Sequence, residues 1–180
     1  MADNIENSPE NTKEFSARLM AVQACYEITQ NSKPVRIVVQ EFLERGSPID
    51  SDDQAYSKPH GILLKRILFS LDERLVEVNE IVKAHMQKPA PVVEPVVQEI
   101  EKEEGEDYAD AEEVEVFVKE TEPLLKSILL CGVVELLTNL DDDAPLIIND
   151  YLNITHGFYE KQQVSLVNGV LDKVAKLVRD

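Results

Sequence analysis

The chain has 180 residues, 43% of them hydrophobic, and its 35 acidic and 18 basic residues give a formal net charge of −17. This length fits one globular domain with additions. A strongly acidic chain is repelled by bare nucleic acid and by anionic membranes unless its cations gather on one face. The acidic, polar start differs from a signal peptide, and no apolar run approaches the ~18 residues that a membrane-spanning helix needs. The composition therefore predicts a cytoplasmic protein that does not bind membranes.

Hydrophobic residues recur with the helical period soon after a polar tail, residues 1–10, that we expect to be disordered. Asn11 and Glu14 have the spacing of a capping box, which predicts that the first helix begins there. Pro34 suits the first position of a second helix, and Gly46 can end it. The apolar stripe of the first helix comprises Phe15, Leu19, Val22 and Tyr26.

A longer helix is predicted after the turn-rich stretch that follows Gly46. Leucines and valines between Leu64 and Val82 recur in alternating steps of four and three. This spacing predicts one continuous helix of about 25 residues that ends before Pro89, because it keeps all of these side chains on one face.

The excess negative charge is concentrated in the middle of the chain. Thirteen acids and only two bases lie between Pro89 and Glu122, and the segment opens with the proline-rich run KPAPVVEPVV. Proline removes backbone donors and the carboxylates repel one another. We therefore expect residues 88–112 to form a flexible insertion between helical subdomains at 11–87 and 113–180. A solvated linker is the favoured interpretation, and a lure for a basic partner is the alternative.

The second half returns to the helical period. Thr121 is predicted to cap a helix whose apolar residues extend to Leu136, and Asp143 followed by Pro145 starts another helix that ends at Gly157. The last helix has its apolar stripe at Val167, Val170, Leu171, Val174 and Leu177. No stretch shows sustained two-residue alternation. The fold class predicted is all-α, with six to seven helices in two packed subdomains.

Residues that could carry chemistry do not form a recognisable catalytic or metal-binding motif. His60, His85 and His156 have no metal-ligand spacing, and the acids at 141–143 are best explained as a loop that ends in a helix N-cap. Cys25 and Cys131 lie in apolar stretches, where we expect buried, reduced thiols. The sequence therefore predicts a protein that is not an enzyme and that has no cofactor.

Residues 166–173, with the sequence LVNGVLDK, resemble the C-terminal signature F-V-N-G-V-L-D-K/R of the NusB family of transcription antitermination factors. Two weaker similarities occur in the same order as in that family. ARLMAVQACYEI (17–28) is similar to its opening helix, and LLKSILLCGVVEL (124–136) is similar to a later helix, with Glu135 and Leu136 retained.

This resemblance implies a NusB-like, all-helical RNA-binding protein without enzymatic activity. Family members pair with NusE, a small-subunit ribosomal protein, on boxA RNA within the RNA polymerase antitermination complex, chiefly during ribosomal RNA transcription. The residues expected to contact RNA are Lys13, Arg18, Tyr26, Lys161, Gln162 and Lys173. The family's arginine-rich stretch before the opening helix is reduced here to Lys13 and Arg18. The second hypothesis is therefore a helical protein–protein adaptor with weakened or lost RNA binding.

Overall fold

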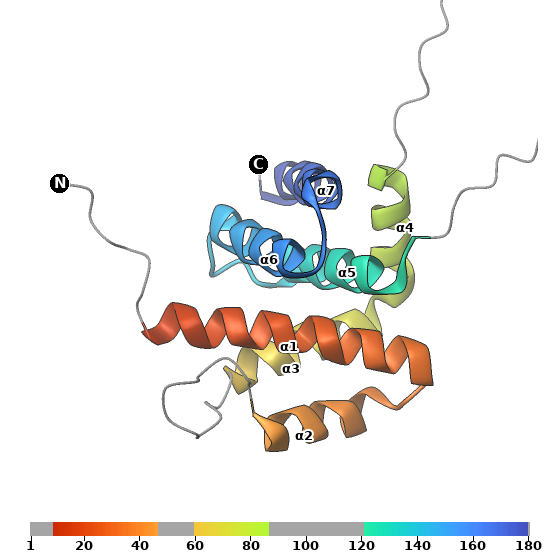
Figure 1. Cartoon of the computed structure of the whole chain (residues 1–180), viewed down its shortest axis with the longest axis vertical. Coiled ribbons are helices and arrows are strands. Elements are labelled where there is room, and N and C mark those ends of the chain that lie inside the picture. Colours follow the sequence, from red (N-terminus) through yellow and green to blue (C-terminus); the bar gives the residue numbers. More distant parts are fainter. Residues whose placement is uncertain (1–8, 47–59, 87–120, 180) are drawn as a thin grey trace, which may run out of the picture.

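The structure is a computed structural model that describes residues 9–46, 60–86 and 121–179, and within these ranges it contains seven α-helices and no strand (Figure 1). The all-α prediction is confirmed. The helices are α1 (Pro9–Asn31), α2 (Val35–Arg45), α3 (Gly61–Glu73), α4 (Leu75–Met86), α5 (Pro123–Thr138), α6 (Ala144–Phe158) and α7 (Lys161–Arg179). No helix in the described ranges is both long enough and apolar enough to span a membrane.

Helix α5 is the centre of the molecule. It packs against α1, α3, α4, α6 and α7, and every residue from Leu125 to Leu136 is buried except Lys126, which is half-buried. A helix that is apolar on all sides belongs in the interior, because no face of it gains from contact with water. Figure 1 shows α1, α2 and α3 below α5, with α6 beside it and α7 above it. A single hydrophobic core therefore includes residues from both predicted halves of the chain.

The apolar stripe predicted for α1 lies at the margin of this core. Val22 is fully buried, Phe15 and Leu19 are half-buried, and Tyr26 is 39% exposed. The residues of α1 that fill the interior are the small or flexible ones on the adjacent face, namely Ala17, Met20, Ala21, Ala24 and Cys25. Small side chains let α1 approach α5 closely, so the larger side chains are left toward the surface.

The long helix predicted between Leu64 and Pro89 is wrong, because two helices meet at Arg74. Arg74 has φ −114° and ψ 18°, outside the helical range, and its guanidinium binds the carboxylate of Glu77. After this break α3 packs on α1 and α5, whereas α4 packs on α5 and α7. The apolar period continues through the break, so spacing alone could not reveal it.

Several helix ends also differ from prediction. Helix α1 begins at Pro9 and not at Asn11, and the cap of α5 is Glu122, whose carboxylate accepts from two backbone N–H groups, in place of Thr121. Pro34 precedes the first residue of α2, and α6 continues one residue beyond Gly157.

Other predicted ends are confirmed. Gly46 ends α2 with φ 74°, a conformation that favours glycine, and Asp143 occupies the N-cap of α6. The predicted insertion at 88–112 lies outside the described residues, as does most of the predicted tail at 1–10, although its last two residues begin α1. The boundaries of the two subdomains stay a prediction.

Two helical glycines provide a matched test of the packing. A Cβ at Gly132 would lie 2.8 Å from Cδ2 of the fully buried Leu171, whereas a Cβ at Gly169 would meet nothing within 4 Å. We expect Gly169→Ala to raise the free energy of unfolding by about 0.5–1 kcal/mol through helix propensity alone. Gly132→Ala should lower it, because overpacking costs about 1–3 kcal/mol. Urea denaturation measures both, and stabilisation by both substitutions would contradict the packing of α5 on α7.

Candidate nucleic-acid interface

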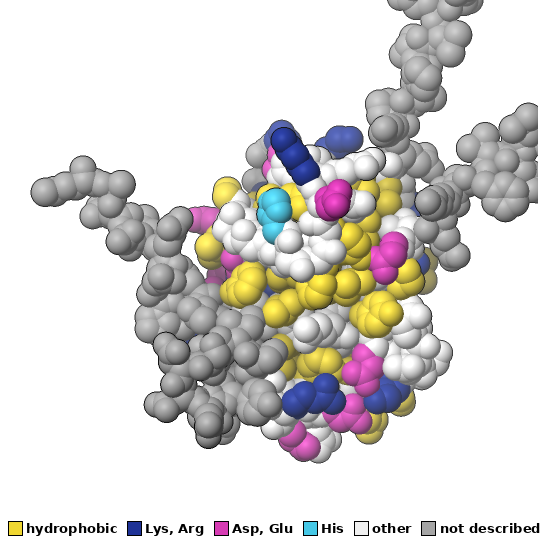
Figure 2. All heavy atoms as spheres, in the orientation of Figure 1, with side chains coloured by type: hydrophobic (Ala, Val, Ile, Leu, Met, Phe, Trp, Pro, Cys, Tyr) yellow, Lys and Arg dark blue, Asp and Glu magenta, His cyan; other side chains and the backbone are white. Residues whose placement is uncertain are grey.

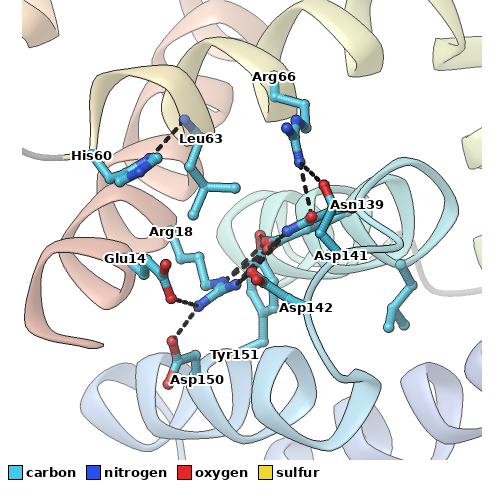
Figure 3. A network of polar contacts seen from close by, with 12 residues as sticks. Glu14, Arg18, His60, Leu63, Arg66, Asn139, Asp141, Asp142, Asp150 and Tyr151 are labelled. Atoms are coloured by element: carbon cyan, nitrogen blue, oxygen red, sulfur yellow. Dashed lines mark hydrogen bonds and ion pairs between the residues drawn. The ribbon is translucent and has the colours of Figure 1, made fainter. Parts of the chain in front are cut away.

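Arg18 occupies the polar centre of the protein, and its side chain is fully buried. Its Nε lies 3.0 Å from Oε1 of Glu135, and its Nη2 lies 2.6 Å from the same oxygen. Nη2 also donates to Asp142 at 2.9 Å, and Nη1 donates to Asp150 at 2.7 Å (Figure 3). The guanidinium of α1 therefore binds carboxylates from α5, from the α5–α6 connection and from α6.

Further hydrogen bonds complete the coordination of these carboxylates. The hydroxyl of Tyr151, a fully buried residue of α6, donates to Oε2 of Glu135 at 2.8 Å. The amide of Asn139 donates to Asp142 at 2.9 Å and accepts from Arg66 of α3 at 2.8 Å. A buried charge is tolerated only when its remaining lone pairs and protons find partners, and this network supplies them.

A second arginine fixes the connection between α5 and α6 from the other side. Arg179, at the end of α7, donates to the backbone carbonyls of Leu136, Asn139 and Asp142. These carbonyls belong to the C-terminal end of α5 and the turn after it, where unpaired acceptors and the negative end of the helix dipole favour a cation. The connection that carries Asp142 is thereby held in place from both ends.

The electrostatics of the network reflect its excess of carboxylates. Burial alone disfavours the charge of Arg18, but its hydrogen bond and Coulomb attraction to Glu135 outweigh this and raise the pKa of the guanidinium. Burial, with the neighbouring charges of Glu135 and Asp142, raises the pKa of Asp150 above its usual 3.8. Burial and the nearby Asp142 likewise raise the pKa of Glu14. Ionisation of Glu14 and Asp150 is therefore less favourable in the folded protein than it is for a carboxyl group in water.

Arg18 was predicted to contact RNA phosphate, and the structure corrects this prediction. A fully buried guanidinium that already binds three carboxylates has no open face for a phosphate group. Its role in this fold is to join α1 to α5 and α6. Arg18 and Glu135 both lie within segments that are similar to the NusB family, but no pattern in the sequence pairs them.

The other five predicted residues are at the surface. Lys13 is exposed near the start of α1, and Tyr26 is 39% exposed near its end. Lys161 and Gln162 are exposed in the first turn of α7, and Lys173 is exposed twelve residues further along this helix. Twelve residues correspond to about 18 Å of α-helix. The predicted contacts therefore extend over two helices and do not form one compact cluster.

One face of the molecule includes α1 and the end of α6. Figure 2 shows hydrophobic side chains gathered on this face over α1, α5 and α6, with cations above and below them. The α6–α7 connection, which precedes Lys161, also lies on this side (Figure 1). The hydroxyl of Tyr159 in this connection donates to the carboxylate of Glu122, which caps α5. The corner formed by residues 157–160, just before Lys161, is therefore held to the start of α5.

Sequence reasoning missed Phe158, the last residue of α6, which is 48% exposed on this corner. Its spacing continues the apolar stripe of Ile147, Tyr151 and Ile154, so the helical period alone would assign it to the core. The signal that could have found it is Gly157, which is placed one residue earlier and marks the approaching end of the helix.

The two cysteines are buried and free, as the sequence predicted. Cys25 lies on α1 and Cys131 lies on α5, the two helices that Arg18 and Glu135 also join. A hydrogen bond from the Cys131 thiol lowers the pKa of Cys25, while this contact and burial raise the pKa of Cys131.

Over the described residues, the fold and this polar centre define an all-helical protein in which a buried ion pair joins α1 to the second half of the chain. The NusB family model matches residues 112–176. "Transcription antitermination protein NusB" from Novosphingobium aromaticivorans is 24% identical over 164 residues, which cover 91% of this chain and 93% of the relative. The protein of the same name from Rhizobium etli is 25% identical over 181 residues, which cover 99% and 97%.

The solved structure of T. maritima NusB has the same fold, with a TM-score of 0.60 at 15% identity, covering 94% of this chain and 92% of that one. The resemblance indicated by residues 166–173 is therefore confirmed, since residues 112–176 match the NusB family model and the chain is similar to curated NusB proteins over most of its length.

The buried ion pair can be tested by a double-mutant cycle. Removal of one partner from a buried ion pair leaves an uncompensated charge and costs about 3–5 kcal/mol. We expect Arg18→Met and Glu135→Gln each to lower the free energy of unfolding by roughly this amount. The double variant should lose less than the sum of the two, because it no longer leaves the fully buried carboxylate of Glu135 without its guanidinium. Additive losses in urea denaturation would show that the two side chains act independently.

The raised pKa of Asp150 predicts a pH dependence of stability. Because its pKa is higher in the folded than in the unfolded protein, its contribution is fully present below the usual value and is lost as pH rises through the raised folded value. The free energy of unfolding of the unsubstituted protein minus that of Asp150→Asn should therefore decrease from acidic to neutral pH. Glu77→Gln is the control of opposite sign, because Arg74 lowers the pKa of Glu77. A difference that rises with pH for Asp150→Asn would contradict the assignment.

Proposed function

We propose that this protein is a transcription antitermination factor, not an enzyme, that binds boxA RNA together with NusE, a small-subunit ribosomal protein, during ribosomal RNA transcription. The observation that carries this proposal is the match of residues 112–176 to the NusB family model, on a fold shared with T. maritima NusB. Participation in the RNA polymerase antitermination complex follows from the same similarity.

The exposed residues of α1 and α7 support an RNA-binding surface. Lys161 and Lys173 offer charges for phosphate, and Gln162 has both a donor and an acceptor for the edge of a base. Lys13 offers a further charge near the other end of α1 from Tyr26. Arg18 is not among the proposed RNA contacts, because its guanidinium is bound inside the protein.

The charge balance favours joint binding with a basic partner. A chain of net charge −17 gains little from long-range attraction to RNA, since its acids repel phosphate within a Debye length of about 8 Å at physiological salt. A basic ribosomal protein would supply the missing positive charge and hold the RNA across the joint surface. Binding to boxA RNA by the pair should therefore be tighter than binding by this protein alone.

A helical adaptor that binds protein partners but little RNA is the second candidate function. The burial of Arg18 favours it, because this removes one of the two cations that remained from the family's arginine-rich stretch. The two candidates differ in a single measurable property, affinity for boxA RNA.

A gel-shift with boxA RNA and a scrambled RNA of the same composition, with and without NusE, tests the proposal. We expect selective binding of boxA that NusE strengthens. Lys161→Ala with Lys173→Ala should reduce the slope of log affinity against log salt by roughly 1.4, from about 0.7 per phosphate contact on a single strand. Lys33→Ala is the matched control, because Lys33 is already paired with Glu27 and Glu41. Association with NusE and no selective binding of boxA would support the adaptor.

A further inference from the structure

Phe158 is a large aromatic side chain that the fold leaves at the surface. It is the last residue of α6 and is 48% exposed. Gly157, immediately before it, has open space where a side chain would be. A ring that is half in water loses part of the roughly 1.5–3 kcal/mol that its full burial would contribute. The exposed part of the ring is therefore open to contact by a ligand.

The backbone that presents this ring is fixed on both sides. The N–H of Tyr159 donates to the carbonyl of Thr155, and its hydroxyl donates to Glu122 at the N-terminus of α5. The carbonyl of Glu160 then accepts from the N–H groups of Gln163 and Val164 and so begins α7. The corner at residues 157–160 is thereby tied to three helices, so the ring of Phe158 is presented by a preorganised element.

The surroundings of the ring favour a nucleobase over an aliphatic side chain of a protein partner. Among the described residues of α1, α5 and α6, the exposed large hydrophobic side chains are Tyr26 and Phe158, and both are aromatic. The exposed aliphatic side chains belong to other helices or connections. Lys161 and Gln162 follow within one turn and provide groups for phosphate and for a base edge. Single-stranded RNA is held by this combination of aromatic faces, on which unpaired bases stack, with nearby cations.

We infer that Phe158 is a base-stacking residue of this protein, which holds an unpaired base of single-stranded RNA on the α6–α7 corner beside Lys161 and Gln162. This inference rests on the proposed RNA-binding function and deepens it. Part of the RNA affinity then comes from an uncharged interaction, which the net charge of the protein does not oppose.

The test uses the full-length protein, NusE and fluorescein-labelled boxA RNA, with affinity measured by fluorescence anisotropy over a series of salt concentrations. Phe158→Ala should weaken RNA binding roughly 5- to 150-fold, the usual effect of removing one stacking partner, and leave the salt slope unchanged. Phe158→Leu should weaken binding to a similar degree because it keeps the apolar volume but has no π-face. Phe158→Trp should retain affinity. Lys161→Ala should instead reduce the salt slope.

Two further measurements separate stacking from other roles. Leu177→Ala, a substitution of a 73% exposed residue near the end of α7, is the control and should bind normally. Thermal unfolding and association with NusE should be nearly unchanged in Phe158→Leu. Normal RNA binding by Phe158→Ala would overturn the inference and leave the proposed function intact. Weaker NusE association, with RNA binding retained, would overturn it in favour of a protein contact. No boxA binding by the unsubstituted protein would overturn the proposed function, and the inference with it.

Discussion

The buried contact between Arg18 and Glu135 is the interaction on which the rest of the structure depends. It joins the first helix to the central helix across 117 positions of sequence, and Asp142 and Asp150 extend it to the connection before α6 and to α6 itself. Buried ion pairs add little net stability because desolvation offsets their attraction. Their geometry is nevertheless demanding, so this pair fixes how the two halves of the chain are oriented on their shared core.

The apolar period was sufficient to predict an all-helical fold, but neither this polar centre nor the division of α3 from α4. Arg18 lies beside the stripe of Phe15, Leu19 and Val22, where a long charged side chain ordinarily reaches into water. Its acceptors are more than a hundred residues away, and no local pattern identifies them. The break at Arg74 could not be predicted for a related reason. The apolar residues of α3 and α4 keep one helical spacing, but the two helices pack against different neighbours.

The candidate interface was predictable only where local rules decide exposure. Lys161 and Gln162 follow the end of an apolar stripe, and both are exposed as expected of a polar turn and first helical turn. Phe158 was not predictable by the same reasoning, because it continues that stripe at the helical spacing. Its exposure depends on tertiary structure. Helix α6 ends at Phe158, and the chain then turns toward α7 while Tyr159 binds Glu122 at the start of α5. The exposure of residues 157–160 therefore depends on contacts with residues far away in the sequence, such as Glu122.

The same internal network determines how such a protein could hold RNA at all. Arg18, Arg66 and Arg179 direct their guanidinium groups to acceptors within the protein, so the cations available on α7 are mainly lysines, which bind phosphate as point charges and not in a bidentate manner. An acidic chain that binds three of its arginines internally has little electrostatic attraction left for a polyanion. Stacking on an aromatic side chain is not weakened by net charge or by salt in the way that phosphate contacts are. On the proposed function, a basic partner protein and an aromatic corner are therefore complementary solutions to one constraint, which is the negative charge of the chain.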